Sequence, residues 1–363
     1  MLLTLSNFLK NNYFYLFSIL PITISLFFEG SFYGFLFLLI FLLISIFSRS
    51  LLGIICSGII LHLFVYYSLT SIYTSNISGG LWFQVFASWI SAIIFVSRLA
   101  FIKPKNDFLK KLMILVVPFF FGLWVILLWE LICVGFNVPL LLLPAPSLIG
   151  VQISNSLDIL YADFYQTVIK AVIPGYIYGC GSAFILSIII DRSPFLQRGL
   201  LPIGNLVSVM PIVGIAPIMV MWFGFDWQSK AAVVTIMTFF PMLVNTVAGL
   251  QIANNIDHDV MSTWGSSYWQ SLLKMRLPKA LPLIFNGLKI NTTLALIGAI
   301  VAEFFGTPIV GMGFRISVEA QRMSFDLVWA EITMAAIVGS TLYGLLALLE
   351  RYLTFWHPSF HNR

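Results

Sequence analysis

The stretch "DVMSTWGSSYWQSLLKMRLPKALP", residues 259–282, lies between two of the most apolar stretches of the chain, yet it is partly polar and ends in basic residues. Its apolar residues recur every three or four positions, which is typical of an amphipathic helix. The members of this predicted stripe are Met261, Trp264, Tyr268, Leu272 and Met275. Gly265 interrupts the stripe and indicates a bend or a close backbone approach, and Pro278 disfavours helix for Leu277 before it. We therefore predict two short helices at an angle, which end before the next apolar segment.

The composition around this stretch is that of a membrane protein. Of the 363 residues, 60% are hydrophobic and 9% are charged, whereas a soluble domain has about 45–50% apolar and about 25% charged residues. The apolar runs are long enough to cross about 30 Å of hydrocarbon as helices, and they lack the alternating pattern of a membrane barrel. Because backbone groups inside a bilayer must be paired within each span, we predict an all-α polytopic membrane protein.

About ten helices are expected to cross the membrane. The expected spans are 13–28, 32–48, 51–70, 81–99, 113–133, 168–190, 201–223, 231–250, 280–302 and 329–349. With the N-terminus inside, most lysines and arginines of the short loops fall on the cytoplasmic side, as the positive-inside rule requires. The basic clusters at 98–111 and 274–279 both lie inside only if the number of spans is even. The stretch 259–282 then becomes a cytoplasmic loop, and both termini are cytoplasmic.

The chain is expected to have three parts. The basic segment "RLAFIKPKNDFLKK", residues 98–111, divides four leading spans from six following ones. We expect residues 1–111 to form extra transmembrane helices with a basic cytoplasmic linker. Residues 112–355 should form the core, with a cytoplasmic loop at 251–279, and residues 356–363 should form a cytoplasmic tail.

Two roles for the loop fit its pattern equally well. It is typical of an interfacial helix whose Lys274, Arg276 and Lys279 contact anionic lipid headgroups. It is also typical of a knob that inserts a short helix into a groove of a cytoplasmic partner. Spacing alone leaves both interpretations open.

The loop also resembles the cytoplasmic coupling loop of the permeases of binding-protein-dependent ABC importers. That loop has the pattern Glu-Ala-Ala, three residues, Gly, nine residues, Ile, any residue, Leu-Pro. Asp259 stands here at the acidic position, while Val260 and Met261 replace the alanines and make the loop bulkier. The residues that the resemblance assigns to ATPase coupling are Asp259, Val260, Met261, Trp264, Gly265, Met275, Leu277 and Pro278.

Other stretches resemble the sulfonate, taurine and nitrate branch of that family. They are "LWELICVGFNVPLLLLPAPSLI" (128–149), "VMPIVGIAPIMVMWFGFDWQSK" (209–230), "TFFPMLVNTVAGL" (238–250) and "AEFFGTPIVGMGFRISVEAQ" (302–321). Together the resemblance covers about residues 113–355. It implies a type I importer fold with a six-helix core, preceded here by about four extra helices.

The resemblance implies an assembly in a bacterial inner membrane. Two permease subunits, expected to be a homodimer, would form the pathway, and a cytoplasmic ABC ATPase would drive it. A periplasmic or lipid-anchored substrate-binding protein would deliver a small polar or anionic solute, of the sulfonate, taurine, nitrate, bicarbonate or vitamin-precursor pyrimidine class. The chain has no Gly-Lys-Ser or Gly-Lys-Thr of a P-loop, so ATP and Mg²⁺ belong on the partner. We expect no catalytic residue, no cofactor or metal, and no nucleic-acid partner for this chain.

Five residues are candidates for the translocation pathway. A charge at the centre of a span costs about 2.5–3.5 kcal/mol on insertion scales, which draws attention to Lys289 and Glu303 around the ninth span. Structural pairing is the favoured alternative for both. Asn291 could line the pathway, although bonding to a neighbouring helix is favoured. Pro211 and Pro217 are expected to kink or break their span, and we favour a gate there.

Two other functional classes compete with an importer subunit. A secondary transporter driven by an ion gradient would need carboxylates near mid-membrane or broken helices in two repeats, and no internal repeat is visible. An intramembrane enzyme ranks last, because the chain has no Gly-x-Ser-Gly, no paired Asp motif and no His-Glu-x-x-His.

Overall fold

The computed structural model describes residues 13–27, 31–47, 51–74, 79–101, 107–193, 195–199, 202, 211–253, 255–306 and 309–356. The regular secondary structure of these residues is entirely helical. Seven helical segments are long and apolar enough to cross a membrane, and two further apolar helices, Phe32–Ile46 and Ile212–Phe223, are shorter. Each of the ten expected spans overlaps a described helix. The predicted all-α polytopic membrane protein is therefore confirmed.

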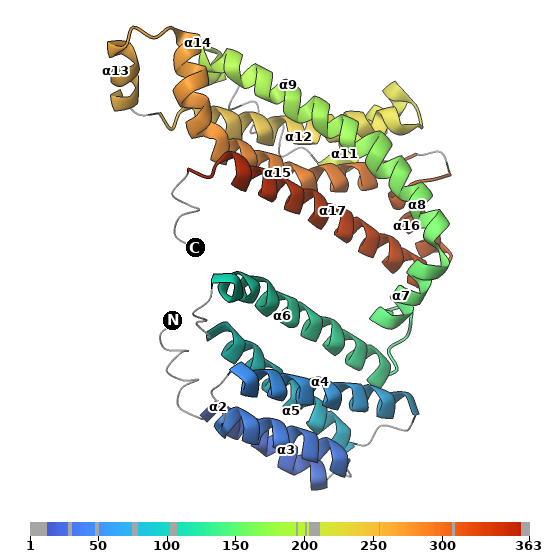
Figure 1. Cartoon of the computed structure of the whole chain (residues 1–363). Coiled ribbons are helices and arrows are strands. Elements are labelled where there is room, and N and C mark those ends of the chain that lie inside the picture. The colour runs from blue at the N-terminus through green and yellow to red at the C-terminus, as the bar shows by residue number, and fades with distance from the viewer. Residues whose placement is uncertain are drawn as a thin grey trace. The chain divides into compact units, whose positions relative to one another are not determined.

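The chain divides into two compact units, Met1–Ser147 and Leu148–Arg363. The first unit contains the helices α2 (Tyr13–Phe27), α3 (Phe32–Phe47), α4 (Leu51–Thr74), α5 (Gly79–Phe101) and α6 (Asp107–Gly135) (Figure 1). Helix α6 packs against α4 and α5, and its Trp124 belongs to their apolar core. The first compact unit therefore extends beyond residue 111. The expected functional division after residue 111 stays a prediction.

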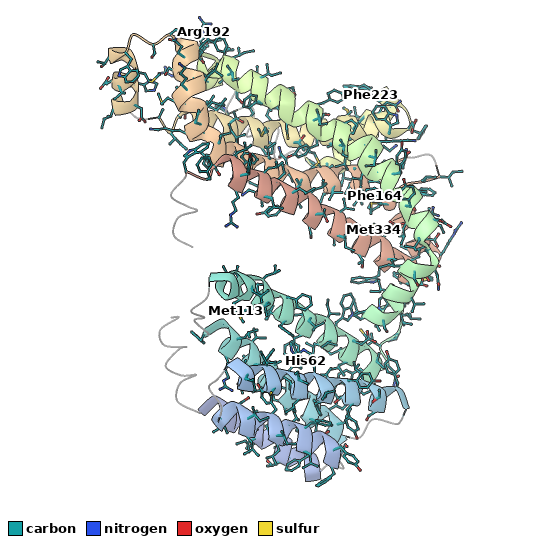
Figure 2. The ribbon with its side chains drawn as sticks, in the orientation of Figure 1. His62, Met113, Phe164, Arg192, Phe223 and Met334 are labelled. Atoms are coloured by element: carbon teal, nitrogen blue, oxygen red, sulfur yellow. The ribbon has the colours of Figure 1, made fainter. Side chains whose placement is uncertain are left out.

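His62 of α4 is part of the core of the first unit (Figure 2). Its ring centroid lies 5.4 Å from those of Phe120 and Trp124, and its Nδ1 lies 2.7 Å from the carbonyl oxygen of Gly58. Aromatic rings at such distances attract one another edge to face. His62 therefore serves packing.

A carboxylate organises the end of the first unit. The Glu130 carboxylate accepts hydrogen bonds from the Tyr73 hydroxyl at 2.6 Å, the Ser147 hydroxyl at 2.7 Å and the Ser147 backbone N–H at 2.9 Å. Ser147 closes the Leu-Pro-x-Pro-Ser element, and α7 (Pro146–Asn155) begins beside it. The bond from Tyr73 joins α4, one of the four leading helices, to this element.

The second unit contains the other helices. They are α8 (Leu157–Phe164), η1 (Tyr165–Val172), α9 (Ile173–Asp191), α11 (Ile212–Phe223), α12 (Trp227–Leu250), α13 (Asn255–Thr263), α14 (Tyr268–Ser271), η2 (Leu272–Arg276), α15 (Leu277–Glu303), α16 (Met312–Gln321) and α17 (Phe325–Leu353). The segments η1 and η2 are π-helical. Helix α12 packs against both α9 and α15 (Figure 1).

Glycine allows α9 to approach α12 closely. A Cβ atom added at Gly179 would lie 2.0 Å from the Thr238 Oγ1 atom and 2.7 Å from the Thr235 carbonyl oxygen. Association of helices in lipid depends on such close backbone packing, because lipid tails are as apolar as the side chains. Gly179 therefore fixes how near these two helices can lie.

The helix after the loop is longer than predicted. The segments α14, η2 and α15 form one continuous helical segment of 36 residues, Tyr268–Glu303, so the predicted end of the second short helix before the apolar span is wrong. Pro278 follows directly on the π-helical turn Leu272–Arg276. Hydrogen bonds in such a turn skip one residue more than in an α-helix. This leaves room for a proline ring and requires no N–H from it.

The two prolines of the expected third core span differ in their surroundings. Pro211 has an extended backbone, with φ −67° and ψ 122°, and α11 begins directly after it. Pro217 lies inside α11. Pro211 therefore directly precedes α11, and the expected break of the span there stays a prediction. Residues 203–210 of the expected span lie outside the described residues.

Candidate functional site in the loop between α12 and α15

Gly265 ends the first helix of the loop. Its φ of +63° lies in the left-handed region, which glycine adopts without the steric cost of a Cβ atom. The Gly265 N–H donates to the Ser262 carbonyl oxygen at 2.9 Å, and the Ser266 N–H donates to the Met261 carbonyl oxygen at 3.1 Å. This pair of bonds closes the C-terminus of α13 as a Schellman motif. The glycine that the pattern associated with a bend is a helix terminator.

Ser267 starts the next helix two residues later. The Gln270 N–H donates to the Ser267 hydroxyl at 3.4 Å, and the Ser267 N–H donates to the Gln270 side-chain oxygen at 2.9 Å. The reciprocal bonds form a capping box, which satisfies two amides at the start of a helix. The chain between α13 and α14 is therefore a defined turn.

The apolar face of α13 differs from the predicted stripe. Ile256, Val260 and Trp264 are 71%, 53% and 84% exposed, and their spacing of four residues places them on one helical face. The predicted stripe over residues 261–275 is wrong. Helix α13 ends before Gly265, so the stripe residues after this turn lie on a different helix from Met261. Leu272 is instead buried. The surface of α13 thus presents an apolar face, beside the exposed Asp259.

The second half of the loop is anchored to α9 and α12. Asp191, at the end of α9, accepts bonds from Arg276 Nη1 at 2.7 Å and from Arg276 Nη2 at 2.5 Å. It also accepts a bond from the Tyr268 hydroxyl at 3.0 Å. Arg276 Nη2 donates in addition to the carbonyl oxygen of Leu250, the last residue of α12, at 3.0 Å. Paired arginine–carboxylate bonds constrain orientation as well as distance, so α14 and η2 are held on two core helices.

One ion pair links the two halves of the loop. Lys279, near the start of α15, donates to Asp257 of α13. The Lys279 side chain is half-exposed, so this pair contributes little to stability. Among the remaining predicted coupling residues, Met261, Met275, Leu277 and Pro278 are half-buried. The loop thus combines an exposed first helix with a firmly held second one.

Two of the predicted pathway residues pair helices within the second unit. The Lys289 ammonium group donates to Glu350 of α17 at 2.7 Å and lies 6.0 Å from the centroid of the Tyr343 ring. Asn291 is buried and donates to the Thr238 carbonyl oxygen of α12 at 2.7 Å. Both residues therefore bond to neighbouring helices, the alternative that the residue types favoured.

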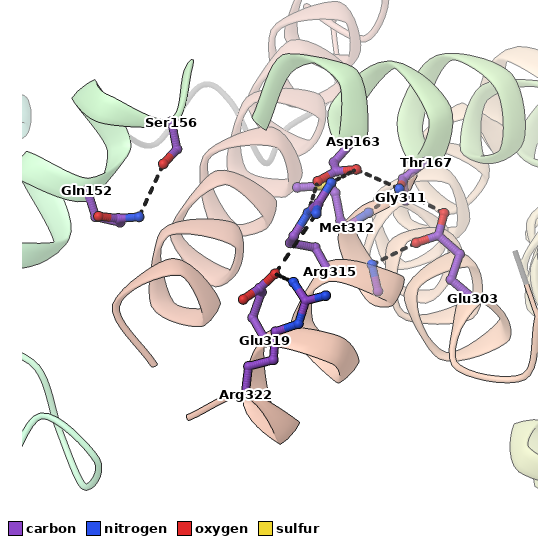
Figure 3. A network of polar contacts seen from close by, with 11 residues as sticks. Gln152, Ser156, Asp163, Thr167, Glu303, Gly311, Met312, Arg315, Glu319 and Arg322 are labelled. Carbon is purple, nitrogen blue, oxygen red and sulfur yellow. Dashed lines mark hydrogen bonds and ion pairs between the residues drawn. The ribbon is translucent and has the colours of Figure 1, made fainter. Parts of the chain in front are cut away.

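Glu303 belongs to a polar network at the start of α16 (Figure 3). Its carboxylate accepts from the Thr167 hydroxyl at 2.8 Å and from the Gly313 N–H at 2.7 Å. Asp163 accepts from the Gly311 N–H at 2.6 Å and from Arg315 Nε at 2.8 Å. Two carboxylates thus receive the free amides of the α16 N-terminus, where negative charge is stabilised. The α16 network, as we name it, consists of Asp163, Thr167, Glu303, Gly311, Met312, Gly313 and Arg315.

Arg315 remains charged within this network. Partial burial is the largest single influence and disfavours the charged form, but the hydrogen bond to Asp163 and the charges of nearby carboxylates together outweigh burial and raise the pKa of Arg315 above its ordinary value. Sequence reasoning singled out Glu303 but not Asp163, Thr167 or Asp191. Asp163 and Asp191 lie toward the two ends of the apolar helical segment Leu157–Asp191, and such a position alone does not reveal a partner.

The comparisons with known proteins identify relatives for most of the second unit. Residues 175–354 match the family model described as binding-protein-dependent transport system inner membrane component. The chain is 29% identical over 223 residues to the riboflavin transport system permease protein of Chloroflexus aurantiacus, covering 61% of this chain and 82% of that protein. It is 28% identical over 239 residues to the formylaminopyrimidine transport permease protein of Halalkalibacterium halodurans, covering 66% and 95%. It is also 29% identical over 188 residues to a putative aliphatic sulfonates transport permease protein of Bacillus subtilis, covering 52% and 68%.

Proposed function

This chain belongs to the inner membrane components of binding-protein-dependent transport systems, and on that premise we propose that it is the permease subunit of an ATP-driven importer. Its relatives are transport permeases, so it is a transport subunit. The hydrolysis of ATP with Mg²⁺ would take place on a separate cytoplasmic ATPase. One observation carries the proposal. The loop between α12 and α15 combines an exposed first helix with a second helix that is held on the core helices.

In the proposed mechanism, α13 is the contact element for the ATPase. Its face of Ile256, Val260 and Trp264 suits a groove that accepts a short amphipathic helix, and Asp259 lies on the same exposed helix. The anchors of Arg276 on Asp191 and Leu250 would carry a displacement of the loop to α9, α12 and α15. The spans would then exchange between outward-open and inward-open states.

The proposed substrate is a small polar or anionic solute. The relatives are named for riboflavin, a formylaminopyrimidine and aliphatic sulfonates, which share small size and polar groups. Selection among such solutes would rest with an external substrate-binding protein, and a second permease copy would complete the pathway. We propose the extended backbone at Pro211, with Pro217 inside α11, as the gate of this chain, and structural pairing for Lys289, Asn291 and Glu303.

Co-purification tests the proposal directly. Tagged protein is extracted gently from its native membranes, and the proteins that accompany it are identified by mass spectrometry. We expect a P-loop ATPase with the unaltered chain, its loss from Trp264→Ala, and its retention in the matched control Trp222→Ala, which removes another exposed tryptophan from α11. Absence of an ATPase from every sample would contradict the proposal. Uptake driven by an ion gradient in vesicles without an ATPase would then establish the secondary-transporter alternative.

A further inference from the structure

Glu331 of α17 is a buried carboxyl group that the proposed transport mechanism does not use. The residue is 0% exposed. Within the part of the chain that the structure describes, neither of its carboxyl oxygens has a hydrogen-bond partner. Buried polar groups are almost always paired, so a carboxyl group with two unpaired oxygens requires a physical reason.

The charged groups around Glu331 come from all three helices packed against α17. These helices are α8, α15 and α16, and they contribute Asp163, Glu303 and Arg315 as the groups that interact electrostatically with Glu331. Two of the three are carboxylates. A like charge nearby disfavours ionisation of a carboxyl group.

Among the described residues, the cation that acts on Glu331 is Arg315, and it is already engaged. Arg315 bonds to Asp163 through Nε at 2.8 Å and lies 4.0 Å from Glu319. Glu319 pairs in addition with Arg322 at 3.1 Å. On the other side, Lys230 interacts with Glu303, and its ammonium group donates to the carbonyl oxygens of Phe225 and Asp226.

The described cations around the site are already matched by carboxylates other than Glu331. Lys230, Arg315 and Arg322 stand against Asp163, Asp226, Glu303 and Glu319. An ionised Glu331 would be a fifth negative charge without a cation of its own. Burial of such a charge is strongly unfavourable, and a buried carboxyl group takes up a proton instead.

We propose that Glu331 and Asp163 form a proton-binding site, in which the proton rests on Glu331 and is donated to the Asp163 carboxylate. Two ionised carboxylates have no hydrogen between them, which accounts for the unpaired oxygens of Glu331 beside Asp163. Asp163 has capacity for the bond, because a carboxylate offers about four acceptor positions. The Gly311 N–H, Arg315 Nε and Arg315 Nη2 use three of them.

The proton would join α17 to α8 and to the N-terminus of α16. Its release would leave two facing carboxylates, which repel each other across this junction. Entry of water between α8 and α17 would favour release, and closure would favour uptake. The site lies outside the coupling loop, and its existence can be tested without measuring transport.

Infrared spectroscopy of the full chain in a detergent without ester or carboxyl groups detects the proton. The carbonyl stretching band of a protonated carboxylic acid is recorded at neutral pH for the unaltered chain, for Glu331→Gln and for the control Glu130→Gln. Glu130 is a buried carboxylate that three hydrogen-bond donors satisfy. We expect one such band in the unaltered chain, its loss from Glu331→Gln, and its retention in Glu130→Gln. Absence of the band from the unaltered chain, or its persistence in Glu331→Gln, would overturn the proposal.

Two further arms keep the test decisive. If Glu331→Gln is not recovered folded, ¹³C labelling of the glutamate carboxyl groups in the unaltered chain must shift the band, and an unshifted band would overturn the assignment to glutamate. Thermal unfolding with and without Na⁺ distinguishes a proton from a metal cation. Stabilisation of the unaltered chain by Na⁺, without the infrared band, would mean that the carboxylates bind a cation and would refute a proton site.

Discussion

At the scale of single residues, the backbone conformation at position 265 favours glycine, whereas the space around it would admit a larger residue. The φ of Gly265 is +63°, and a Cβ atom added there would meet nothing within 4 Å. A residue with a Cβ atom in the left-handed conformation costs about 1–2 kcal/mol, whereas asparagine visits this region more readily than most. The identity of the residue therefore controls how well the turn after α13 is populated.

We predict that Gly265→Ala weakens binding of the partner ATPase about tenfold, because about 1.4 kcal/mol of backbone strain corresponds to a factor of ten. Gly265→Asn should bind more tightly than Gly265→Ala. Affinity is measured with purified ATPase and detergent-solubilised permease. Gly181→Ala serves as the control, because a Cβ atom at Gly181 also meets nothing within 4 Å. Equal affinities for the alanine and asparagine variants at position 265 would contradict the Schellman turn as the cause.

At the scale of elements, the close approach of α9 and α12 depends on the small residues between them. Gly179 faces Thr238 and Thr235 so closely that a methyl group has no room. The same α12 also contacts α15, where a Cβ atom added at Gly249 would lie 3.1 Å from the Cβ atom and the carbonyl oxygen of Ala280. A side chain at the first contact would push α9 away from α12, while the second contact tolerates a small adjustment.

Gly179→Ala should lower the stability of the protein by about 1–3 kcal/mol, the usual range for an overpacked contact. The measurement is thermal unfolding in detergent, followed by intrinsic tryptophan fluorescence. Gly181→Ala lies on the same helix with open space around it and should change stability by less than about 0.5 kcal/mol. A loss of equal size in both variants would mean that glycine matters for helix flexibility and not for packing.

At the scale of the whole molecule, the helical segment Tyr268–Glu303 joins two polar sites of the second unit. It begins beside the Asp191 anchor of the loop and ends in the α16 network. At 1.5 Å per residue, its 36 residues extend about 54 Å. We expect motion at the loop end of this segment to reach the α16 network through its continuous helical backbone.

Ile290→Pro should separate the two ends, because a proline inside a helix removes one hydrogen bond and kinks the axis. Ile290 is half-exposed, so the substitution changes the backbone more than the packing. We expect the variant to co-purify with the ATPase and to lose solute uptake, while Ile290→Ala retains both. Co-purification also confirms that the loop has folded. Uptake at the unaltered rate would show that continuity of this helix is not required.

The sequence predicted the spans because a bilayer requires about 20 apolar residues for each helix, and apolar runs are visible without any knowledge of contacts. The local roles of Gly265 and Pro278 were harder to predict. The same glycine suits a bend or a helix terminator, and Pro278 lies within a continuous helical segment although a proline disfavours helix for the residue before it. Asp163 and Glu303 lie far apart in the sequence, so their common network depends on packing that no local pattern encodes.

The exposed face of α13 has a consequence for the abundance of this protein in the cell. A chain made in excess of its partner would present Ile256, Val260 and Trp264 to water, and exposed apolar surface is what chaperones and proteases recognise in orphan subunits. The abundance of the permease should then follow that of the ATPase, whatever the rate of its own synthesis. The docking surface that we propose on α13 would thus link the abundance of this chain to that of its proposed ATPase.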